Sequence, residues 1–338
     1  MIKVAIVGAS GYAGAELVSI LLKHPKVLLT NLFVSEKSED KNKKINSLYG
    51  SLFNKTDLIL EPLPSGDKLK DTFRAIDAVF LATDHKVSHD IAPILYEAGC
   101  AVFDLSGAYR LKNLSAYEKY YGFKHEHLEL LNKAVYSICE IANHDEIKNT
   151  RMLSIPGCYT TSAELPLIPL SHEKLLDVNF VPVINSVSGV SGAGRKAKLS
   201  NSFCEVSLNA YNIFKHRHLP EIEEYVKTKV IFNPHLGSFK RGILTTITAK
   251  LVPGVDAASV LAVFLKYYEN KPLIRIKNEL PKLQDVINQP YCDIGFSVNE
   301  DGYIVICSAI DNLQKGAAAQ AVQTLNLHFD FNETTALL

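Results

Sequence analysis

The sequence predicts a two-domain α/β protein, with an N-terminal doubly wound parallel sheet and a second, α+β domain whose sheet is largely antiparallel. Three observations lead to this expectation. A short apolar strand pattern runs into a glycine-rich turn and then into a helical pattern within the first 25 residues. Strand and helix patterns alternate up to about residue 150. Strand-rich segments separated by longer helical runs follow.

The first of these patterns indicates a dinucleotide-binding, Rossmann-type domain. Residues 4–7 form a β-branched-rich strand, and a helical pattern continues to Pro25. Between them Gly8, Gly11 and Gly14 are spaced as GxxGxxG. We expect Gly8 to allow the tight turn, Gly11 to admit a pyrophosphate, and Gly14 to let the helix pack on the strand. The alternative is a turn whose glycines serve packing alone.

The loop after the second strand favours NADP over NAD. The strand at residues 28–35 ends where Ser35, Lys37 and Ser38 surround Glu36. Small polar and basic groups at this position suit the 2′-phosphate of NADP, whereas a solvated charged loop is the alternative. A third strand at 75–83, a helix at 84–99 and a fourth strand from 100 complete the doubly wound pattern.

The second half of the chain changes to an α+β pattern. Its expected elements are strands at 179–194, 242–254 and 302–312 and helices at 257–270 and 315–329. We expect the last, Ala-rich helix to return to the first domain. The predicted parts, with a cleft shared between the first two, are an NADP-binding domain at 1–153, a catalytic and dimerisation domain at 154–311, and a C-terminal helix at 312–338.

The composition is that of a globular protein with a small ligand. Its 338 residues are 47% hydrophobic and 21% charged, enough for two domains that each bury a core. Lys+Arg and Asp+Glu both number 36, so no basic excess indicates nucleic acid or an anionic membrane as partner. No apolar run approaches the length of a membrane span, and KVAIVG opens the chain without a signal-peptide pattern.

The six cysteines are scattered along the chain. They show neither the paired CxxC spacing of a zinc site nor the density of a secreted disulfide scaffold. We therefore expect free thiols in a reducing compartment, a cytoplasmic protein and no bound metal.

One cysteine has the setting of a nucleophile. Cys158 follows a Pro-Gly turn and opens a helical pattern, and the unpaired N–H groups of a helix start favour thiolate over thiol. The alternative is a buried, inert cysteine. A base is also required, and His216 and His218 precede Pro220 at a second helix start. These histidines have an alternative as well, a polar surface turn.

These residues carry a family resemblance. The segment PGCYTTSAELPL, at Cys158, resembles the PGCYPT signature of the N-acetyl-gamma-glutamyl-phosphate reductase family. Further blocks resemble that family in the same order along nearly the whole chain: GASGYAGAELVSILLKHP, DLSGAYRL, SVSGVSGAGR, HRHLPEI, FKRGILTTI and DNLQKGAAAQAVQTLN. Two departures are Thr160, where the signature usually has proline, and Ala319, where the last block usually has glycine.

The resemblance implies a two-domain enzyme related to aspartate-semialdehyde dehydrogenase, with NADP as cofactor and Cys158 as nucleophile. The expected reaction is the NADPH-dependent reduction of N-acetyl-gamma-glutamyl phosphate to the semialdehyde and phosphate, a step of arginine biosynthesis, through a cysteine thioester. One of His216 and His218 should exchange protons, and His218 is slightly preferred. A homodimer or homotetramer is expected.

Three alternatives remain open. An aminoadipate-pathway reductase differs by one methylene in its substrate, and aspartate-semialdehyde dehydrogenase shares the chemistry. A non-catalytic dinucleotide sensor would need only the glycine turn.

We also expect particular side chains at the substrate and the cofactor. The substrate candidates are three arginines suited to forked hydrogen bonds and one acid: Arg110, Arg195, Arg241 and Glu221. The cofactor candidates lie in the glycine-rich turn and in or just after predicted strands: Gly8, Ser10, Gly11, Tyr12, Gly14, Ser35, Lys37, Ser38, Ala82, Ser106, Ser188, Gly189, Gly192 and Asn312.

Overall fold

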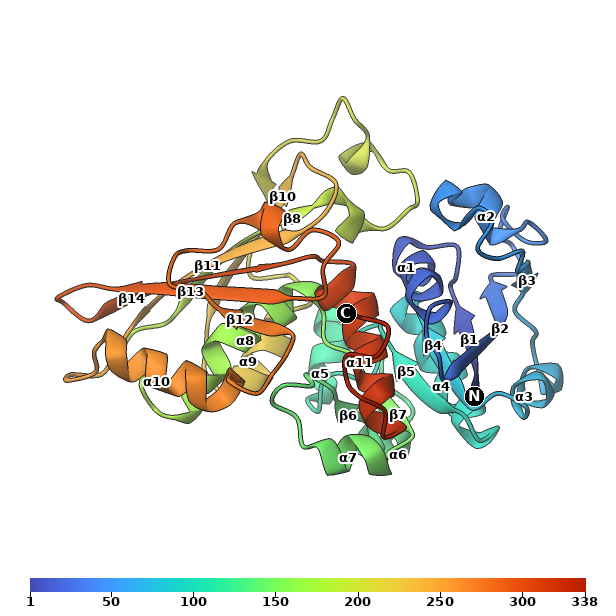
Figure 1. The fold of residues 1–338 in the computed structure, drawn as a ribbon, viewed down its shortest axis with the longest axis horizontal. Helices are drawn as coiled ribbons and strands as arrows, with labels where there is room; N and C mark the ends of the chain where they lie inside the picture. The colour runs from blue at the N-terminus through green and yellow to red at the C-terminus, as the bar shows by residue number, and fades with distance from the viewer. The chain divides into compact units, whose positions relative to one another are not determined.

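The chain forms two compact units, coloured along the sequence in Figure 1. The computed structural model describes residues 1–199 and 201–338 with their side chains, and residue 200 by its backbone alone. Unit 1 consists of residues 1–156 together with 317–338, and unit 2 consists of residues 157–316. These bounds differ by a few residues from the three parts expected from the sequence.

Unit 1 is built on a seven-stranded sheet in the order β3-β2-β1-β4-β5-β7-β6, and all of its neighbouring strands are parallel. The predicted doubly wound sheet is therefore confirmed. The strands are β1 (Ile2–Val7), β2 (Val27–Val34), β3 (Leu60–Pro62), β4 (Ala78–Leu81), β5 (Ala101–Asp104), β6 (Val135–Tyr136) and β7 (Met152–Ser154). Because β2 lies on one side of β1 and β4 on the other, the end of β1 is a topological switch point, where such folds bind ligands.

Helices cover both faces of this sheet. Alternate residues of β1 enter different cores, with Val4 and Ile6 in one and Ala5 and Val7 in the other. The first core is shared with α1 and α11 and the second with α3 and α4. The helices and helical turns of the unit are α1 (Tyr12–Leu21), α2 (Ile45–Leu48), η1 (Gly50–Leu52), α3 (Asp67–Phe73), α4 (His85–Glu97), α5 (Leu114–Ala116), η2 (Tyr117–Tyr121), α6 (Leu128–Lys133), α7 (His144–Asn149) and α11 (Ala319–His328).

The C-terminal helix α11 belongs to unit 1 although it follows unit 2 in the sequence. Its apolar residues lie in the core beneath β1, and its buried Asn326 joins three segments. The Asn326 Oδ1 atom lies 2.8 Å from His24 Nε2, and its Nδ2 donates to the carbonyl oxygens of Glu333 and Thr335 at 3.1 and 3.0 Å. These bonds hold the last residues of the chain against unit 1.

Unit 2 contains a second seven-stranded sheet, in the order β12-β13-β14-β11-β8-β10-β9. The pairs β8/β10 and β12/β13 are parallel and the other neighbours are antiparallel, so the predicted largely antiparallel sheet is confirmed. The strands are β8 (Val183–Gly189), β9 (Asn209–Ala210), β10 (Ile231–Gly237), β11 (Ile243–Lys250), β12 (Ile274–Ile276), β13 (Cys292–Val298) and β14 (Tyr303–Ile310).

The central helix of unit 2 is α8, which is buried from Tyr159 to Leu170. Polar side chains fix it to the sheet: Ser162 Oγ lies 2.7 Å from Thr245 Oγ1 on β11, and Ser308 on β14 donates to the Ser162 carbonyl. The helices and helical turns that begin in unit 2 are α8 (Cys158–His172), η3 (Val190–Ala193), η4 (Leu199–Asn201), α9 (Leu219–Val226), α10 (Ala257–Tyr268), η5 (Leu283–Asp285) and η6 (Gln314–Ala318). The last of these, η6, continues into unit 1.

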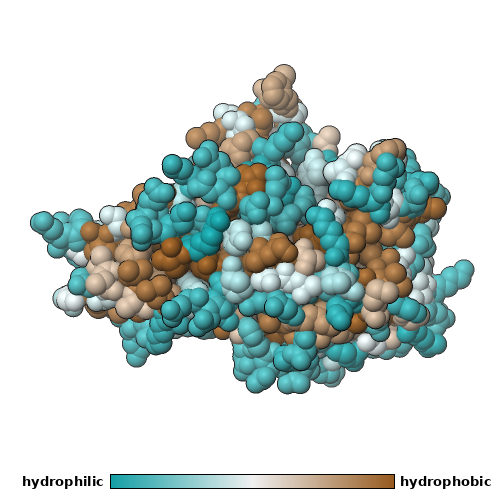
Figure 2. Space-filling view, in the orientation of Figure 1, coloured by the Kyte–Doolittle hydropathy of each residue, from teal (hydrophilic) through white to brown (hydrophobic). Residues whose placement is uncertain are grey.

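A lobe of unit 2, residues 195–214, projects from the body of the unit (yellow-green in Figure 1). It exposes four large apolar side chains: Leu199, Phe203, Leu208 and Phe214. Brown, apolar side chains are visible on this projecting lobe in Figure 2. Grouped apolar side chains on a surface are typical of a surface that contacts another chain.

Candidate active site

The glycine-rich turn follows β1 at the switch point of unit 1. Gly8 has a φ of +88°, and a Cβ there would lie 2.2 Å from the Ala82 carbonyl oxygen. A Cβ on Gly14 would lie 2.4 Å from the Gly8 oxygen. Gly11 differs, because its Cβ would meet only the Gly8 oxygen, at an ordinary 3.4 Å. The packing of the turn thus requires glycine at positions 8 and 14. The space next to the Cα of Gly11 is open and can accept a ligand.

Other cofactor candidates of unit 1 lie at the same edge of the sheet. Tyr12 begins α1 directly after Gly11, and the Ser10 carbonyl accepts a hydrogen bond from Tyr49 at 2.8 Å. Ala82 follows β4 and Ser106 follows β5, where the Ser106 amide donates to Asp104 Oδ1 at 2.9 Å. The carboxyl ends of three neighbouring strands therefore bring these candidates to one edge.

The loop after β2 is ordered by its own side chains. Ser35 Oγ accepts the Lys37 amide at 3.3 Å, and the Ser38 amide donates to the Ser35 carbonyl at 2.8 Å. Glu36 forms an ion pair with Lys41 at 2.9 Å. The carboxylates of Glu36 and Asp40 in this loop are thus paired with Lys41 and Lys43, while Lys37 is exposed.

Cys158 is the first residue of α8 in unit 2, as the sequence predicts. Its N-cap Gly157 is extended, and Cys158 is partly exposed. A Cβ on Gly316 would lie 2.9 Å from the Cys158 Cβ, so a residue larger than glycine at position 316 would crowd Cys158. Cys100 shows the contrast, because burial raises the pKa of its thiol to about 12 and its sulfur donates to backbone carbonyls. The Cys158 thiol, in contrast, is partly exposed to solvent and lies at a helix start, and both conditions favour a reactive thiolate.

The two histidines lie at the start of α9, and neither belongs to an exposed surface turn. His216 is 7% and His218 5% exposed, and their rings lie 4.8 Å apart. His216 Nδ1 accepts the His218 amide at 3.2 Å, and its Nε2 lies 3.4 Å from Tyr211 Oη. Burial, with Arg217 nearby, lowers the pKa of His216 to about 3. His216 is therefore neutral near pH 7, with its proton on Nε2.

Two tyrosines complete this cluster and were not among the residues predicted from the sequence. Tyr211 Oη donates to Tyr159 Oη at 3.3 Å, and Tyr159 Oη donates to the His235 carbonyl at 2.8 Å. The Tyr159 ring meets those of His216 and His218 edge-on. Burial raises the pKa of both tyrosines, and the nearby Cys158 sulfur raises it further. Cys158, the two histidines and the two tyrosines thus form one group of unit 2.

Glu221, a substrate candidate, is fully buried at the start of α9. Its Oε1 accepts the Gly157 amide and the Thr160 hydroxyl, each at 2.9 Å. The carboxylate is therefore directed at the first turn of α8. A contact with substrate stays a prediction.

The three arginine candidates have different surroundings. In unit 1, Arg110 is 4% exposed and donates to the carbonyls of Ile155 and Leu105, each at 2.8 Å. In unit 2, Arg241 Nε lies 2.7 Å from Asp311 Oδ2 in a largely buried ion pair. Arg195 is exposed after η3. Arg110 and Arg241 thus each hold protein groups in place, and their roles toward substrate stay predictions.

The structure brings the remaining cofactor candidates together in unit 2. A Cβ on Gly189 would lie 2.6 Å from the Arg241 amide nitrogen, so only glycine allows this approach. Asn312 accepts the Gly242 amide at 2.6 Å and donates to Ser191 Oγ at 3.0 Å. A Cβ on Gly192 would lie 3.1 Å from Ser188 Oγ and 3.8 Å from Asn312 Nδ2. Asn312 thus fixes the turn η3, which follows Ser188 and Gly189 at the end of β8 and contains Gly192.

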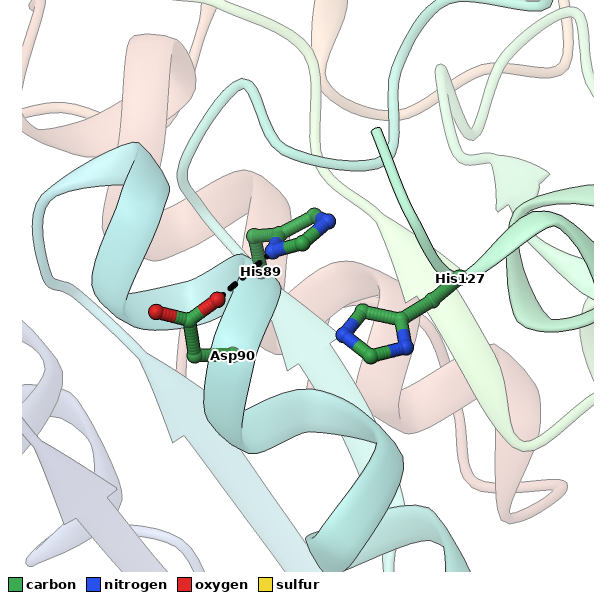
Figure 3. Close-up of side chains that lie close together, drawn as sticks. All are labelled: His89, Asp90 and His127. Carbon is green, nitrogen blue, oxygen red and sulfur yellow. Dashed lines mark hydrogen bonds and ion pairs between the residues drawn. The ribbon is translucent and has the colours of Figure 1, made fainter. Parts of the chain in front are cut away.

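A separate cluster in unit 1 has ligand types that metals use. His89 and Asp90 on α4 face His127, which precedes α6 (Figure 3), and their ligand atoms lie within 4.8 Å of one another. His89 Nε2 accepts the Glu126 amide at 3.1 Å, so its Nδ1 carries the proton donated to Asp90 at 2.7 Å. Asp90 also pairs with Lys86. A metal ion would have to displace these partners, and the expectation of no metal stays a prediction.

Comparison with known proteins defines the class and then the family. Residues 3–150 match the semialdehyde dehydrogenase NAD-binding domain and residues 158–312 the semialdehyde dehydrogenase dimerisation domain. The chain is a semialdehyde dehydrogenase by fold and family. It is 53% identical to N-acetyl-gamma-glutamyl-phosphate reductase of Pasteurella multocida and 51% identical to that of Photorhabdus laumondii, over 100% of each chain. It belongs to the N-acetyl-gamma-glutamyl-phosphate reductase family, as the sequence predicts.

Solved structures share the fold. Aspartate semialdehyde dehydrogenase II of Vibrio cholerae superposes with a TM-score of 0.73 at 17% identity, over 98% of each chain. The enzyme of Candida albicans, solved with NADP, gives a TM-score of 0.71 at 16% identity, over 97% of this chain and 98% of that one. No helix among the described residues has the length and apolar character needed to cross a membrane.

Proposed function

We propose that this chain reduces N-acetyl-gamma-glutamyl phosphate to N-acetyl-glutamate semialdehyde and phosphate, with NADPH as the reductant and a thioester on Cys158 as the intermediate. The observation that supports it most is the cluster at Cys158. A partly exposed cysteine opens a helix whose next residue, Tyr159, meets the rings of two buried histidines edge-on, in a chain about half identical to enzymes named for this reaction.

The first step needs a nucleophilic sulfur. The amide groups at the start of α8 favour the thiolate, which attacks the acyl carbon of the acyl phosphate. A carbon–sulfur bond forms, the carbon–oxygen bond to phosphate breaks, and phosphate leaves with the electron pair and takes up one proton from solvent. The product on the protein is a thioester.

The second step needs a hydride and a proton. Bound NADPH supplies the hydride that reduces the thioester carbon. We assign the proton exchange to His218: it protonates the oxygen of the thiohemiacetal and takes that proton back as the carbon–sulfur bond breaks. The semialdehyde is released and the thiolate is restored. His216 is less suited to this role, because its lowered pKa, about 3, leaves it neutral near pH 7.

The residues of unit 1 fit a nicotinamide dinucleotide. The opening above Gly11 lies at the start of α1, where amide groups favour a pyrophosphate. NADP is the proposed form. Lys37, Ser35 and Ser38 offer a cation and hydroxyl groups to the 2′-phosphate, while Lys41 and Lys43 pair with two acids of the same loop, Glu36 and Asp40.

A homodimer or homotetramer is the proposed assembly. Residues 158–312 match a dimerisation domain, and the lobe of unit 2 exposes four large apolar side chains. Sedimentation of the purified chain tests this: a monomer across the micromolar range contradicts it.

The reaction is tested in reverse, starting from the semialdehyde, NADP and phosphate. The purified chain should reduce NADP with N-acetyl-glutamate semialdehyde only when phosphate is present. The one-carbon-longer homologue and aspartate semialdehyde serve as competing substrates, and preference for either supports the corresponding alternative enzyme. Cofactor binding without phosphate-dependent turnover of any of the three supports a dinucleotide sensor instead.

A further inference from the structure

Two helix starts of unit 2 are joined through one carboxylate oxygen. Helix α8 begins at Cys158, and α9 begins directly after His218. Glu221, in the first turn of α9, places Oε1 2.9 Å from the Gly157 amide and 2.9 Å from the Thr160 hydroxyl, both at the start of α8. Thr160 and Glu221 are each fully buried. The start of α9, which follows His218, is thus hydrogen-bonded to the start of α8, which carries Cys158.

The Thr160 hydroxyl has two acceptors for one proton. It lies 2.5 Å from the Gly157 carbonyl oxygen and 2.9 Å from Glu221 Oε1, a three-centre arrangement common at helix ends. The Gly157 carbonyl already accepts the amide of Thr161 at 2.8 Å and its hydroxyl at 3.0 Å. A carboxylate is also the stronger acceptor. Loss of the Thr160 hydroxyl would therefore leave the Gly157 carbonyl bonded to Thr161, whereas Glu221 would lose its bond to position 160.

We propose that Thr160 is a positioning residue for the reaction: it fixes the Glu221 carboxylate, which holds the His218 end of α9 in register with Cys158. This inference rests on the proposed function, because it assigns His218 and Cys158 their roles. The PGCYPT signature has proline at this position, which stiffens a first helical turn but has no hydroxyl to donate. In this chain Thr160 bonds the first turn of α8 to α9, through its hydroxyl and the Glu221 carboxylate.

The experiment compares three variants of the full chain. Thr160→Val keeps the shape and removes the hydroxyl, whereas Thr160→Ser keeps the hydroxyl. Ser162→Ala is the matched control, because it removes another buried hydroxyl of α8 that bonds the Tyr159 carbonyl and Thr245. The readouts are kcat, KM, thermal stability and the pH profile of Cys158 alkylation by iodoacetamide.

We expect Thr160→Val to lower kcat on the order of tenfold, since misplaced catalytic groups lower the rate more than binding. KM should stay within about twofold, and alkylation near neutral pH should slow. Thr160→Ser should restore both rates, and Ser162→Ala should lose thermal stability alone. In a double-mutant cycle, Thr160→Val should add little to Glu221→Leu, because leucine has no acceptor and both substitutions break the Thr160–Glu221 bond.

The inference is overturned if Thr160→Val loses thermal stability but keeps the kcat and alkylation profile of the parent. It is equally overturned if Ser162→Ala lowers kcat as far as Thr160→Val. Failure of the proposed function looks different, because the parent itself would then show no phosphate-dependent turnover, or Cys158→Ser would retain that turnover whatever Thr160 does.

Discussion

The ring of His216 accepts the backbone amide of His218 at 3.2 Å, directly before the start of α9. The Nδ1 lone pair of His216 is used by that amide, and its Nε2 proton faces Tyr211 Oη at 3.4 Å. Tyr211 in turn donates to Tyr159, and Tyr159 to the His235 carbonyl. This chain of bonds uses both ring nitrogens of His216, which supports assigning the proposed proton exchange to His218.

His218→Asn should therefore lower turnover roughly 10²–10⁴-fold, the usual span for losing a general acid or base. Alkylation of Cys158 by iodoacetamide should also slow near pH 7. His216→Asn should act mainly through the position of His218, with a smaller loss of kcat. Steady-state kinetics and alkylation rates of both variants give the comparison. Equal turnover in the parent and in both variants would show that the histidines take no part.

Cys158→Ser should abolish turnover and preserve NADPH binding, because a hydroxyl is a far weaker nucleophile than a thiolate. Cofactor binding is measured by fluorescence titration and turnover by the phosphate-dependent assay. Cys204→Ser is the matched control, since Cys204 is the exposed cysteine of the same unit. Substantial residual reduction by Cys158→Ser removes the covalent mechanism, and loss of activity in the control points to damage unrelated to the nucleophile.

The glycines of unit 1 should separate ligand binding from folding. Gly11→Val should weaken NADPH binding with little change in thermal stability, because its Cβ meets only the Gly8 oxygen at 3.4 Å. Gly14→Ala should instead lower stability, because its Cβ would lie 2.4 Å from that oxygen. Cofactor titration and thermal unfolding of both variants test this. An unchanged titration for Gly11→Val would show that the turn does not cradle a phosphate.

Local signals were enough to place the main parts of the site. The Pro-Gly pair before Cys158 and Pro220 after His218 mark two helix starts, and the structure begins α8 at Cys158 and α9 at Leu219. Gly8 and Gly14 occur where a Cβ would clash, which a strand, turn and helix pattern is able to indicate. Such features depend on residues close together in the sequence.

The contacts that assemble the cluster depend on residues far apart, and the sequence did not indicate them. Strand β10, which receives the Tyr159 hydroxyl at His235, contains Pro234, and proline obscures a strand pattern. The bond between Thr160 and Glu221 spans 61 residues. A buried carboxylate in the first turn of a helix has the same local pattern as an exposed capping acid. The fold shows that Glu221 is a buried carboxylate and not an exposed capping acid.

Stability in mild acid should depend on the buried histidine His125 of unit 1. Burial, with His89 nearby, lowers its pKa to about 4 from 6.5. The unfolded chain therefore takes up a proton below pH 6.5 while the folded chain stays neutral, so stability is full above pH 6.5 and falls as the pH drops toward 4, by about 3 kcal/mol from this group. His125→Gln should flatten the fall in unfolding free energy between pH 6.5 and 4, measured by urea denaturation. His172→Gln, at an exposed histidine, is the matched control. If the unfolding free energies of the parent and His125→Gln fall in parallel with pH, the pKa of His125 is the same in the folded and the unfolded chain.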